Sequence, residues 1–311
     1  MGLLKISYVV TLISFLWVIL TTVLPNVFPG NFDFNKKLQD QDGYLNTAYY
    51  NSLNTPSILN NKLINSHIML FTAHPDDESM FFTPSITELT KENYNNTFHL
   101  ICLSNGGYDG LGVIRERELF KAAKILDIDS VKILEYVDNI NQFWNTEDII
   151  NSITYEINLI KEQYDFSDDN DIILLTFDKD GVSNHPNHKS VFLAVEKFSK
   201  ISNVRSYSLK SWNIILKYSG ILFSSIEIAV KWLCKCNHFR SIFTSLNIDY
   251  ILNIFDTEIQ SDSVTIYSDL NSLFLNYSTM TWVHYSQIVW FRWIWIFTSK
   301  YMNSNELVPI V

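Results

Sequence analysis

Short apolar runs alternate with segments of helical spacing between residues 64 and 212. The runs predict strands over 64–72, 98–103 and 171–177, and residues 131–136 and 204–212 are further strand candidates. The segments between them predict helices over 78–93, 113–126 and 147–164, and from about 188 to about 199. Apolar strands that alternate with helices are typical of a parallel sheet covered on both faces. The predicted fold is therefore α/β, with a Rossmann-like, mostly parallel sheet and helices on both faces.

The N-terminal hydrophobic segment, residues 6–24, has no charged residue. At about 1.5 Å per residue it spans about 28 Å, close to the thickness of the hydrocarbon layer. A cleaved signal peptide would need a small-residue cleavage site, and the following residues, PNVFP, are a poor one. A buried core helix would carry a polar stripe. The segment therefore predicts an uncleaved N-terminal transmembrane helix. Lys36 and Lys37 after it outnumber Lys5 before it, which favours a cytosolic location for the domain that follows.

The predicted organisation has four parts: an anchor (1–29), a polar linker (30–62), a core domain (63–212) and a C-terminal extension (213–311). The end of the extension is rich in tryptophan, and Arg292 and Lys300 lie among those aromatic residues. Aromatic and basic side chains together suit a membrane interface. This predicts a membrane-associated C-terminal segment, and the alternative is ordinary packing of a helix on the core.

Composition narrows the class of protein. The chain has 311 residues, 47% of them hydrophobic, which is enough for a large core. Charged residues make up 18%, fewer than the roughly 25% typical of soluble domains, so part of the surface is expected to contact lipid. The net charge of −10 argues against nucleic acid as a partner. Three cysteines cannot form an even disulfide framework, which indicates a reducing compartment.

Three loops carry the candidate chemistry, and each follows a predicted strand: AHPDDE, SNGGYDGLG and DKDGVSNHPNH. Because the carboxyl ends of parallel strands meet at one edge of a sheet, these loops should converge. The first packs an imidazole and three carboxylates into residues 74–78, and the last adds His185 and His188. Neighbouring carboxylates repel one another, so the cluster predicts a bound cation.

A catalytic zinc site takes three protein ligands and keeps one position open for water. His74, one of Asp76 and Asp77, and one of His185 and His188 would supply that set. The remaining carboxylate would take a proton from water, and the remaining histidine would stabilise an oxyanion. The alternatives are acids at a helix N-terminus and a chance histidine pair. Because both clusters follow strands of one predicted sheet, we favour a hydrolase that cleaves a carbonyl bond.

The motifs A-H-P-D-D-E at 73–78, R-x-x-E-L at 115–119 and H-P-x-H at 185–188 resemble those of the LmbE-like, or PIG-L, family of zinc-dependent N-deacetylases. The resemblance covers roughly residues 65–200. The N-terminal anchor and residues 286–293 further resemble the eukaryotic branch, the N-acetylglucosaminyl-phosphatidylinositol (GlcNAc-PI) de-N-acetylases.

The resemblance implies a role for each residue of the two clusters. His74, Asp77 and His188 would bind a divalent metal ion, most often zinc. Asp76 would be the general base. His185 would polarise the scissile carbonyl, and we expect its imidazolium to donate the hydrogen bond.

The resemblance also implies the substrate, a GlcNAc-PI lipid in the endoplasmic reticulum membrane, which is deacetylated in the second step of GPI-anchor synthesis. Arg115 would contact its sugar or inositol. Glu118 is a second candidate substrate-binding residue, which would pair with Arg115 or lie on the helix surface. Asn187 stands where other H-P-D-H members have an aspartate. Two alternatives remain: a deacetylase of a soluble N-acetylglucosaminide, and a catalytically inactive membrane scaffold.

Overall fold

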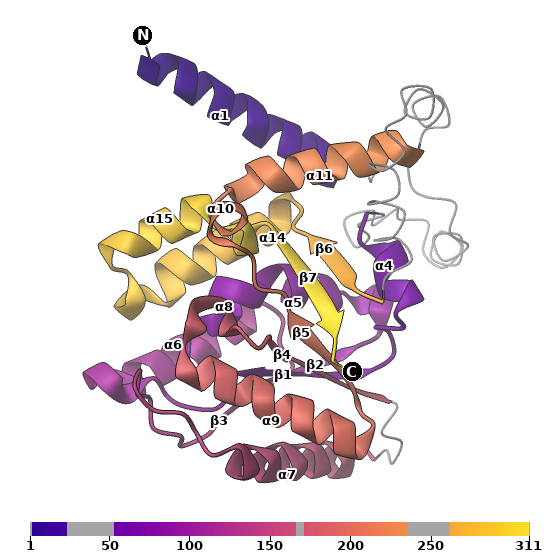
Figure 1. Ribbon diagram of the computed structural model, residues 1–311, viewed down its shortest axis with the longest axis vertical. Helices are drawn as coiled ribbons and strands as arrows, with labels where there is room; N and C mark the ends of the chain where they lie inside the picture. Colours follow the sequence, from indigo (N-terminus) through magenta and orange to yellow (C-terminus); the bar gives the residue numbers. More distant parts are fainter. Residues whose placement is uncertain (1, 24–52, 166–170, 236–261, 311) are drawn as a thin grey trace.

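The computed structural model describes residues 2–23, 53–165, 171–235 and 262–310 (Figure 1). A seven-stranded sheet in the order β3-β2-β1-β4-β5-β7-β6 forms its centre. The strands are β1 (His67–Thr72), β2 (Thr97–Cys102), β3 (Ser130–Ile133), β4 (Ile172–Phe177), β5 (Arg205–Leu209), β6 (Val264–Tyr267) and β7 (Ser304–Pro309). The α-helices are α1 (Gly2–Val18), α4 (Thr55–Asn60), α5 (Thr83–Leu89), α6 (Gly112–Ile125), α7 (Thr146–Tyr164), α8 (Gly181–Asn184), α9 (Pro186–Ser202), α10 (Ile214–Lys217), α11 (Gly220–Lys235), α14 (Leu270–Ser278) and α15 (Trp290–Thr298).

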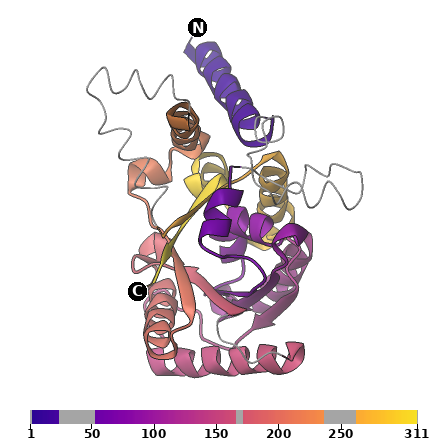
Figure 2. The ribbon, with the colours of Figure 1, turned by 90° about the vertical axis from the view of Figure 1, so that its right-hand side faces the viewer.

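Strands β1 to β5 are parallel, which confirms the predicted α/β fold and its mostly parallel sheet. All six residues of β4 are buried, as expected for a central strand covered on both faces. Helices α7 and α9 pack side by side on one face, and α5 lies on the other (Figure 1, Figure 2). In the register of the first pair, Thr72 lies opposite Cys102, so β1 and β2 end at the same level.

The sheet differs from the prediction in two strands of the C-terminal extension. Strand β7 pairs antiparallel with β5, and β6 pairs antiparallel with β7. The extension therefore completes the same sheet as the core. The predicted helix over 78–93 is also divided, into a π-helix (Glu78–Phe82), α5 and a 3-10 turn (Glu92–Tyr94). A proline in the first turn of α5 marks the point where a new helix begins.

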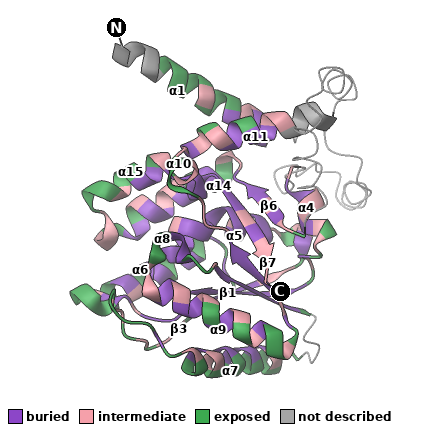
Figure 3. Cartoon of the chain, in the orientation of Figure 1, coloured by how far each residue is buried: buried purple, intermediate pink, exposed green. Residues whose placement is uncertain are grey.

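The N-terminal helix α1 continues into a π-helix (Ile19–Val23) and lies against α11 (Figure 1). Trp17 is 1% exposed and packs in a small cluster with Ile228, Tyr267 and Leu273. Other large apolar side chains of α1, among them Tyr8 and Phe15, are exposed (Figure 3). Within the described ranges, no helix has both the length and the apolar character needed to cross a membrane.

The predicted polar linker over 30–62 lies partly outside the described residues, which resume at 53. Helix α4 begins soon after that point and contacts β6, with Ile58 fully buried. The end of the linker region is therefore packed into the core.

Candidate active site

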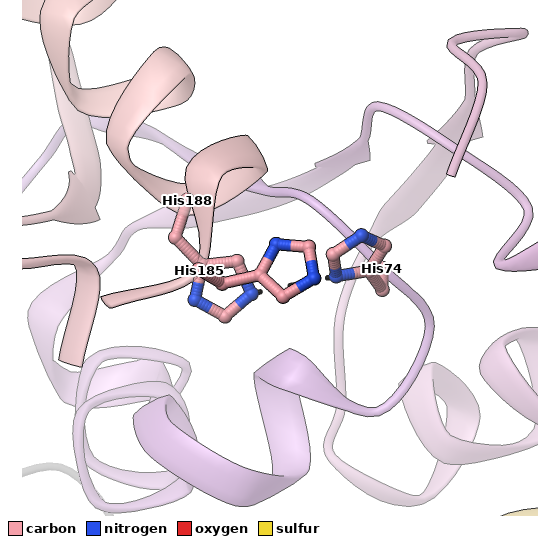
Figure 4. Close-up of side chains that lie close together, drawn as sticks. All are labelled: His74, His185 and His188. Carbon is pink, nitrogen blue, oxygen red and sulfur yellow. Dashed lines mark hydrogen bonds between the residues drawn. The ribbon is translucent and has the colours of Figure 1, made fainter. Parts of the chain in front are cut away.

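The three loops do meet at the carboxyl edge of the sheet. His74 follows β1, and His185 and His188 lie at the start of α9, after β4. The ring centroid of His74 lies 4.8 Å from that of His185 and 5.4 Å from that of His188 (Figure 4). Arg115 lies in the first turns of α6, after β2, and its side chain reaches the same place. Its Nη2 lies 3.4 Å from Asp76 Oδ1. The structure therefore brings together the clusters that the sequence singled out.

One nitrogen of His74, one nitrogen of His188 and the carboxylate of Asp77 face one another at the centre of this group. His188 Nε2 is 3.4 Å from His74 Nδ1 and 3.3 Å from Asp77 Oδ1. His74 Nδ1 is 3.7 Å from Asp77 Oδ2. Ligands about 2.0–2.1 Å from a tetrahedral zinc ion are separated by about 3.3–3.4 Å. The spacing and the N,N,O donor set therefore fit a zinc ion held by His74, Asp77 and His188.

In both His74 and His188, the ring nitrogen that faces away from Asp77 already donates a hydrogen bond. His188 Nδ1 donates to the carbonyl of Gly181 at 3.0 Å. His74 Nε2 lies 3.2 Å from Asp138 Oδ1 and 3.0 Å from the side chain of Asn187. With its amide oxygen towards His74, Asn187 also donates to two backbone carbonyls of the loop after β3. The ring nitrogens that face Asp77 are therefore the ones that a metal ion would bind in place of a proton, and the other nitrogen of each ring is held by a second hydrogen bond.

The Asp77 carboxylate is buried and prepared as a ligand. Its Oδ2 accepts backbone N–H groups of Ala73 at 3.1 Å and His74 at 2.8 Å. Burial alone would raise its pKa, but the neighbouring His188 holds the pKa of Asp77 well below its usual range. Conversely, burial would lower the pKa of His188, and Asp77 raises it. Asp77 is therefore ionised, as a metal ligand must be.

His185 differs from the other two histidines in its hydrogen bonding. It caps α9, and its Nδ1 accepts the N–H of Asn187 at 3.2 Å. Burial and the nearby His74 and His188 lower the pKa of His185 to about 4. The ring is neutral at pH 7, with its proton on Nε2, so the expected imidazolium is wrong. The three imidazoles have nitrogens within 4.8 Å of one another, but a protonated Nε2 has no lone pair for a metal.

Asp76 is buried and lies between two arginines. Its Oδ1 is 3.4 Å from Arg115 Nη2, and its Oδ2 accepts from Arg292 Nη2. Arg115 also donates to the carbonyls of Pro75 at 2.6 Å and Gly106 at 3.0 Å. Arg115, expected to contact the substrate, thus holds together the loops after β1 and β2.

A cavity of about 900 Å³ adjoins the site on the side of β3. Asn105, Tyr108, Glu116 and Asp138 are among the residues that line it. The same Asp138 contacts His74, so the cavity opens beside the donor group. Apolar residues such as Phe120 and Ile133 line it as well, and this mixed lining suits a sugar ring with several hydroxyl groups.

Glu118, also expected near the substrate, binds another part of the protein. Its two oxygens accept from the N–H of Ser286 at 2.8 Å and the hydroxyl of Ser286 at 2.6 Å. Ser286 belongs to the stretch from η7 (Thr279–Val283) through α15, residues 279–298, which we call the aromatic segment. Glu118 therefore fastens the aromatic segment to α6.

The sequence did not indicate that Asp138 and His284 belong to the site. Arg292 was predicted only as part of a basic, aromatic surface and of the resemblance over residues 286–293. His284 contacts Glu78 and Arg292 contacts Asp76, across more than 200 residues of chain in both cases. No local spacing predicts pairs so distant. Asp138 follows a predicted strand, and that position was the available signal.

The family model for PIG-L, described as GlcNAc-PI de-N-acetylase, matches residues 69–199. A probable GlcNAc-PI de-N-acetylase of Schizosaccharomyces pombe is 32% identical over 267 residues, which cover 84% of this chain and 93% of the relative. The GlcNAc-PI de-N-acetylase of Saccharomyces cerevisiae is 30% identical over 275 residues, or 82% and 85% of the two chains. A solved deacetylase–teicoplanin complex is 9% identical, with a TM-score of 0.46 over 78% of this chain and 98% of the other.

Proposed function

Because the chain belongs to the PIG-L family of GlcNAc-PI de-N-acetylases, we infer that it hydrolyses the acetamide of N-acetylglucosaminyl-phosphatidylinositol. The products are acetate and glucosaminyl-phosphatidylinositol, and the reaction belongs to GPI-anchor synthesis. The observation that carries this proposal is the group of His74 Nδ1, His188 Nε2 and Asp77 Oδ, 3.3–3.7 Å apart beside Asp76. These residues lie within the stretch that matches the family.

His74, Asp77 and His188 are the proposed ligands of a divalent ion, and their donor set favours zinc. Such an ion, when bound, supplies a polarised carbonyl and a more acidic water. Asp138 and the Gly181 carbonyl keep the two imidazoles in the orientation that binding needs.

Asp76 and His185 are the proposed catalytic residues. Asp76 accepts a proton from the attacking water, and delivers it to the sugar nitrogen as the C–N bond breaks. Neutral His185 donates Nε2–H to the carbonyl oxygen while negative charge develops there. The acetyl group leaves as acetate, and the amine remains on the sugar. In this scheme Arg115 holds the catalytic loops, and the substrate's sugar and inositol lie in the adjoining cavity.

Membrane attachment is part of the same proposal. Helix α1 and its π-helical continuation form an N-terminal anchor, and the aromatic segment lies on the lipid surface. Exposed Trp290 (76%), Phe297 (70%) and Trp282 (82%) support this, because tryptophan is enriched at membrane interfaces. The compartment we propose is the endoplasmic reticulum, with a single anchor and the catalytic domain in the cytosol.

The two other functions considered lead to different results in one assay. The protein is incubated with GlcNAc-PI in vesicles, with and without a chelator, and free amine and acetate are measured. We expect equal amounts of both products, loss of activity with the chelator and recovery with Zn²⁺. Activity only on a soluble N-acetylglucosaminide would favour the soluble-substrate deacetylase. No activity on either substrate would favour an inactive scaffold, although all five proposed ligand and catalytic residues are present.

A further inference from the structure

The proposed base has a backbone conformation that residues with a side chain rarely adopt. The φ angle of Asp76 is 108°. Such a backbone conformation is strained, and it persists only where its surroundings hold it. The N–H of Asp76 donates to Glu78 Oε2 at 3.0 Å. Glu78 therefore holds the backbone that places the base.

His284, from the aromatic segment, holds Glu78 in turn. Its Nε2 lies 2.5 Å from Glu78 Oε1, and the side chains of His284 and Glu78 are 1% and 0% exposed. Removing one partner of a buried ion pair strongly destabilises a protein, because the other partner stays buried without a compensating charge. Glu78 thus depends on a residue about 200 positions away in the sequence.

Arg292 contacts the carboxylate of the base directly. Its Nη2 donates to Asp76 Oδ2, while Arg115 reaches Asp76 Oδ1 at 3.4 Å. Arg115 is fixed by two backbone carbonyls at 2.6 and 3.0 Å. The two oxygens are therefore oriented by two helices, α6 in the core and α15 in the aromatic segment.

We infer that His284 and Arg292 are positioning residues for Asp76, so that the aromatic segment completes the active site. This inference rests on the proposed role of Asp76 as the base. The segment is joined to the core by the Glu118–Ser286 contacts as well. It also carries exposed Trp290 and Trp293, so the surface proposed to touch lipid belongs to the element that orients the base.

The test compares Arg292→Gln with Arg292→Lys in the full-length protein, with Arg117→Gln as the control. Arg117 lies on α6, is exposed and undergoes the same change of charge. Turnover is measured on GlcNAc-PI in vesicles and on the same glycan without acyl chains, with zinc content alongside. We expect Arg292→Gln to lower kcat about 10²-fold on both substrates, with little change in KM or zinc, because misplaced catalytic groups cost about that much. Arg292→Lys should recover part of the loss, and Arg117→Gln should match the wild type.

A second pair tests His284. Glutamine can still donate to Glu78, so His284→Gln should keep more turnover per bound zinc than His284→Ala. Normal kcat in Arg292→Gln, or a loss explained entirely by lost zinc, would overturn the inference. So would a rise in KM for the vesicle substrate alone, which would assign Arg292 to lipid binding. An inactive wild type would instead overturn the proposed function.

Discussion

At the scale of single residues, the two neighbouring aspartates of the site differ in their hydrogen-bond partners, and so do the two histidines at the start of α9. Spacing alone could not separate Asp76 from Asp77, or His185 from His188. The structure separates them by their hydrogen bonds: Asp77 accepts two backbone N–H groups beside His74, whereas Asp76 lies between two arginines. The difference depends on the φ of 108° at Asp76, which no pattern of residue types predicts.

The neutral state of His185 leads to a prediction about pH. Because its pKa is lowered to about 4, the ring is neutral above about pH 5 and does not change charge between pH 5 and 8. His185→Ala should lower kcat about 10²–10³-fold, the usual cost of one oxyanion donor, and should retain zinc. Its kcat–pH profile over this range should have the same shape as that of the wild type.

An alkaline decrease that is present in the wild type and absent from His185→Ala would contradict this account. It would indicate an imidazolium donor, and a pKa near neutrality for His185. Loss of zinc in the mutant would move His185 into the ligand set.

Asp138 should affect zinc binding through His74. Its Oδ1 lies 3.2 Å from His74 Nε2, on the far side of the ring from Asp77. Removing such a partner typically costs 10–100-fold in metal affinity. Asp138→Asn should therefore weaken zinc binding within about that range, measured by competition with a chromogenic chelator. Asp109→Asn, at an exposed position in the loop after β2, is the control, and equal affinities in both variants would remove Asp138 from the site.

At the scale of elements, strands β1, β2 and β4 could be predicted because each is a largely apolar run, and β3 (SVKI) and β5 (RSYSL) because polar and apolar residues alternate in them. Strand β7 could not, because its first residues are Ser304 and Asn305, both almost fully buried. Asn305 accepts from Ser85 at 2.7 Å and donates to the carbonyl of Phe81 at 2.8 Å. Its burial is compensated by hydrogen bonds to distant residues, and a hydrophobic pattern cannot reveal such partners.

The loop after β2 supplies a matched pair of glycine substitutions. Gly106 and Gly110 both have left-handed φ, +66° and +75°. A Cβ at Gly106 would lie 2.4 Å from the guanidinium of Arg115, whereas a Cβ at Gly110 would meet no atom within 4 Å. Both alanine variants bear the backbone strain, but only Gly106→Ala displaces Arg115. We expect Gly106→Ala to lose much more kcat than Gly110→Ala at similar thermal stability. Equal kcat in the two variants would show that Arg115 has no part in placing the catalytic loops.

At the scale of the whole molecule, both ends of the chain pack around the core that the motifs define. The extension adds two strands to the sheet and two side chains around Asp76 and Glu78. Helix α1 and the π-helix that follows it pack against α11 through Trp17, Leu20 and Ile228. The motifs lie within 69–199, but the described site extends well beyond that range.

Removal of residues 1–23 tests two proposed roles of the N-terminal helix, attachment to the membrane and packing on the domain. We expect the shortened chain to be released from membranes by carbonate and to unfold at a lower temperature, because the packing of Trp17 is lost. Trp17→Ala in the full-length chain should lower the free energy of unfolding by about 3–5 kcal/mol, and with it the melting temperature. This variant should still resist extraction by carbonate. If the shortened chain also resists carbonate, another segment is embedded, and residues 280–300 are the first candidate.

The most direct test of the account measures bound zinc and acetate release together in Asp76→Asn and Asp77→Asn, with GlcNAc-PI as substrate. Asp76→Asn should bind one zinc per chain and lose about 10²–10⁴-fold in turnover, the usual contribution of a general base. Asp77→Asn should lose the zinc itself, and its activity should fall with metal occupancy. The opposite pattern, an empty site in Asp76→Asn and a filled one in Asp77→Asn, would contradict the assignment of ligand and base on which the proposed mechanism depends.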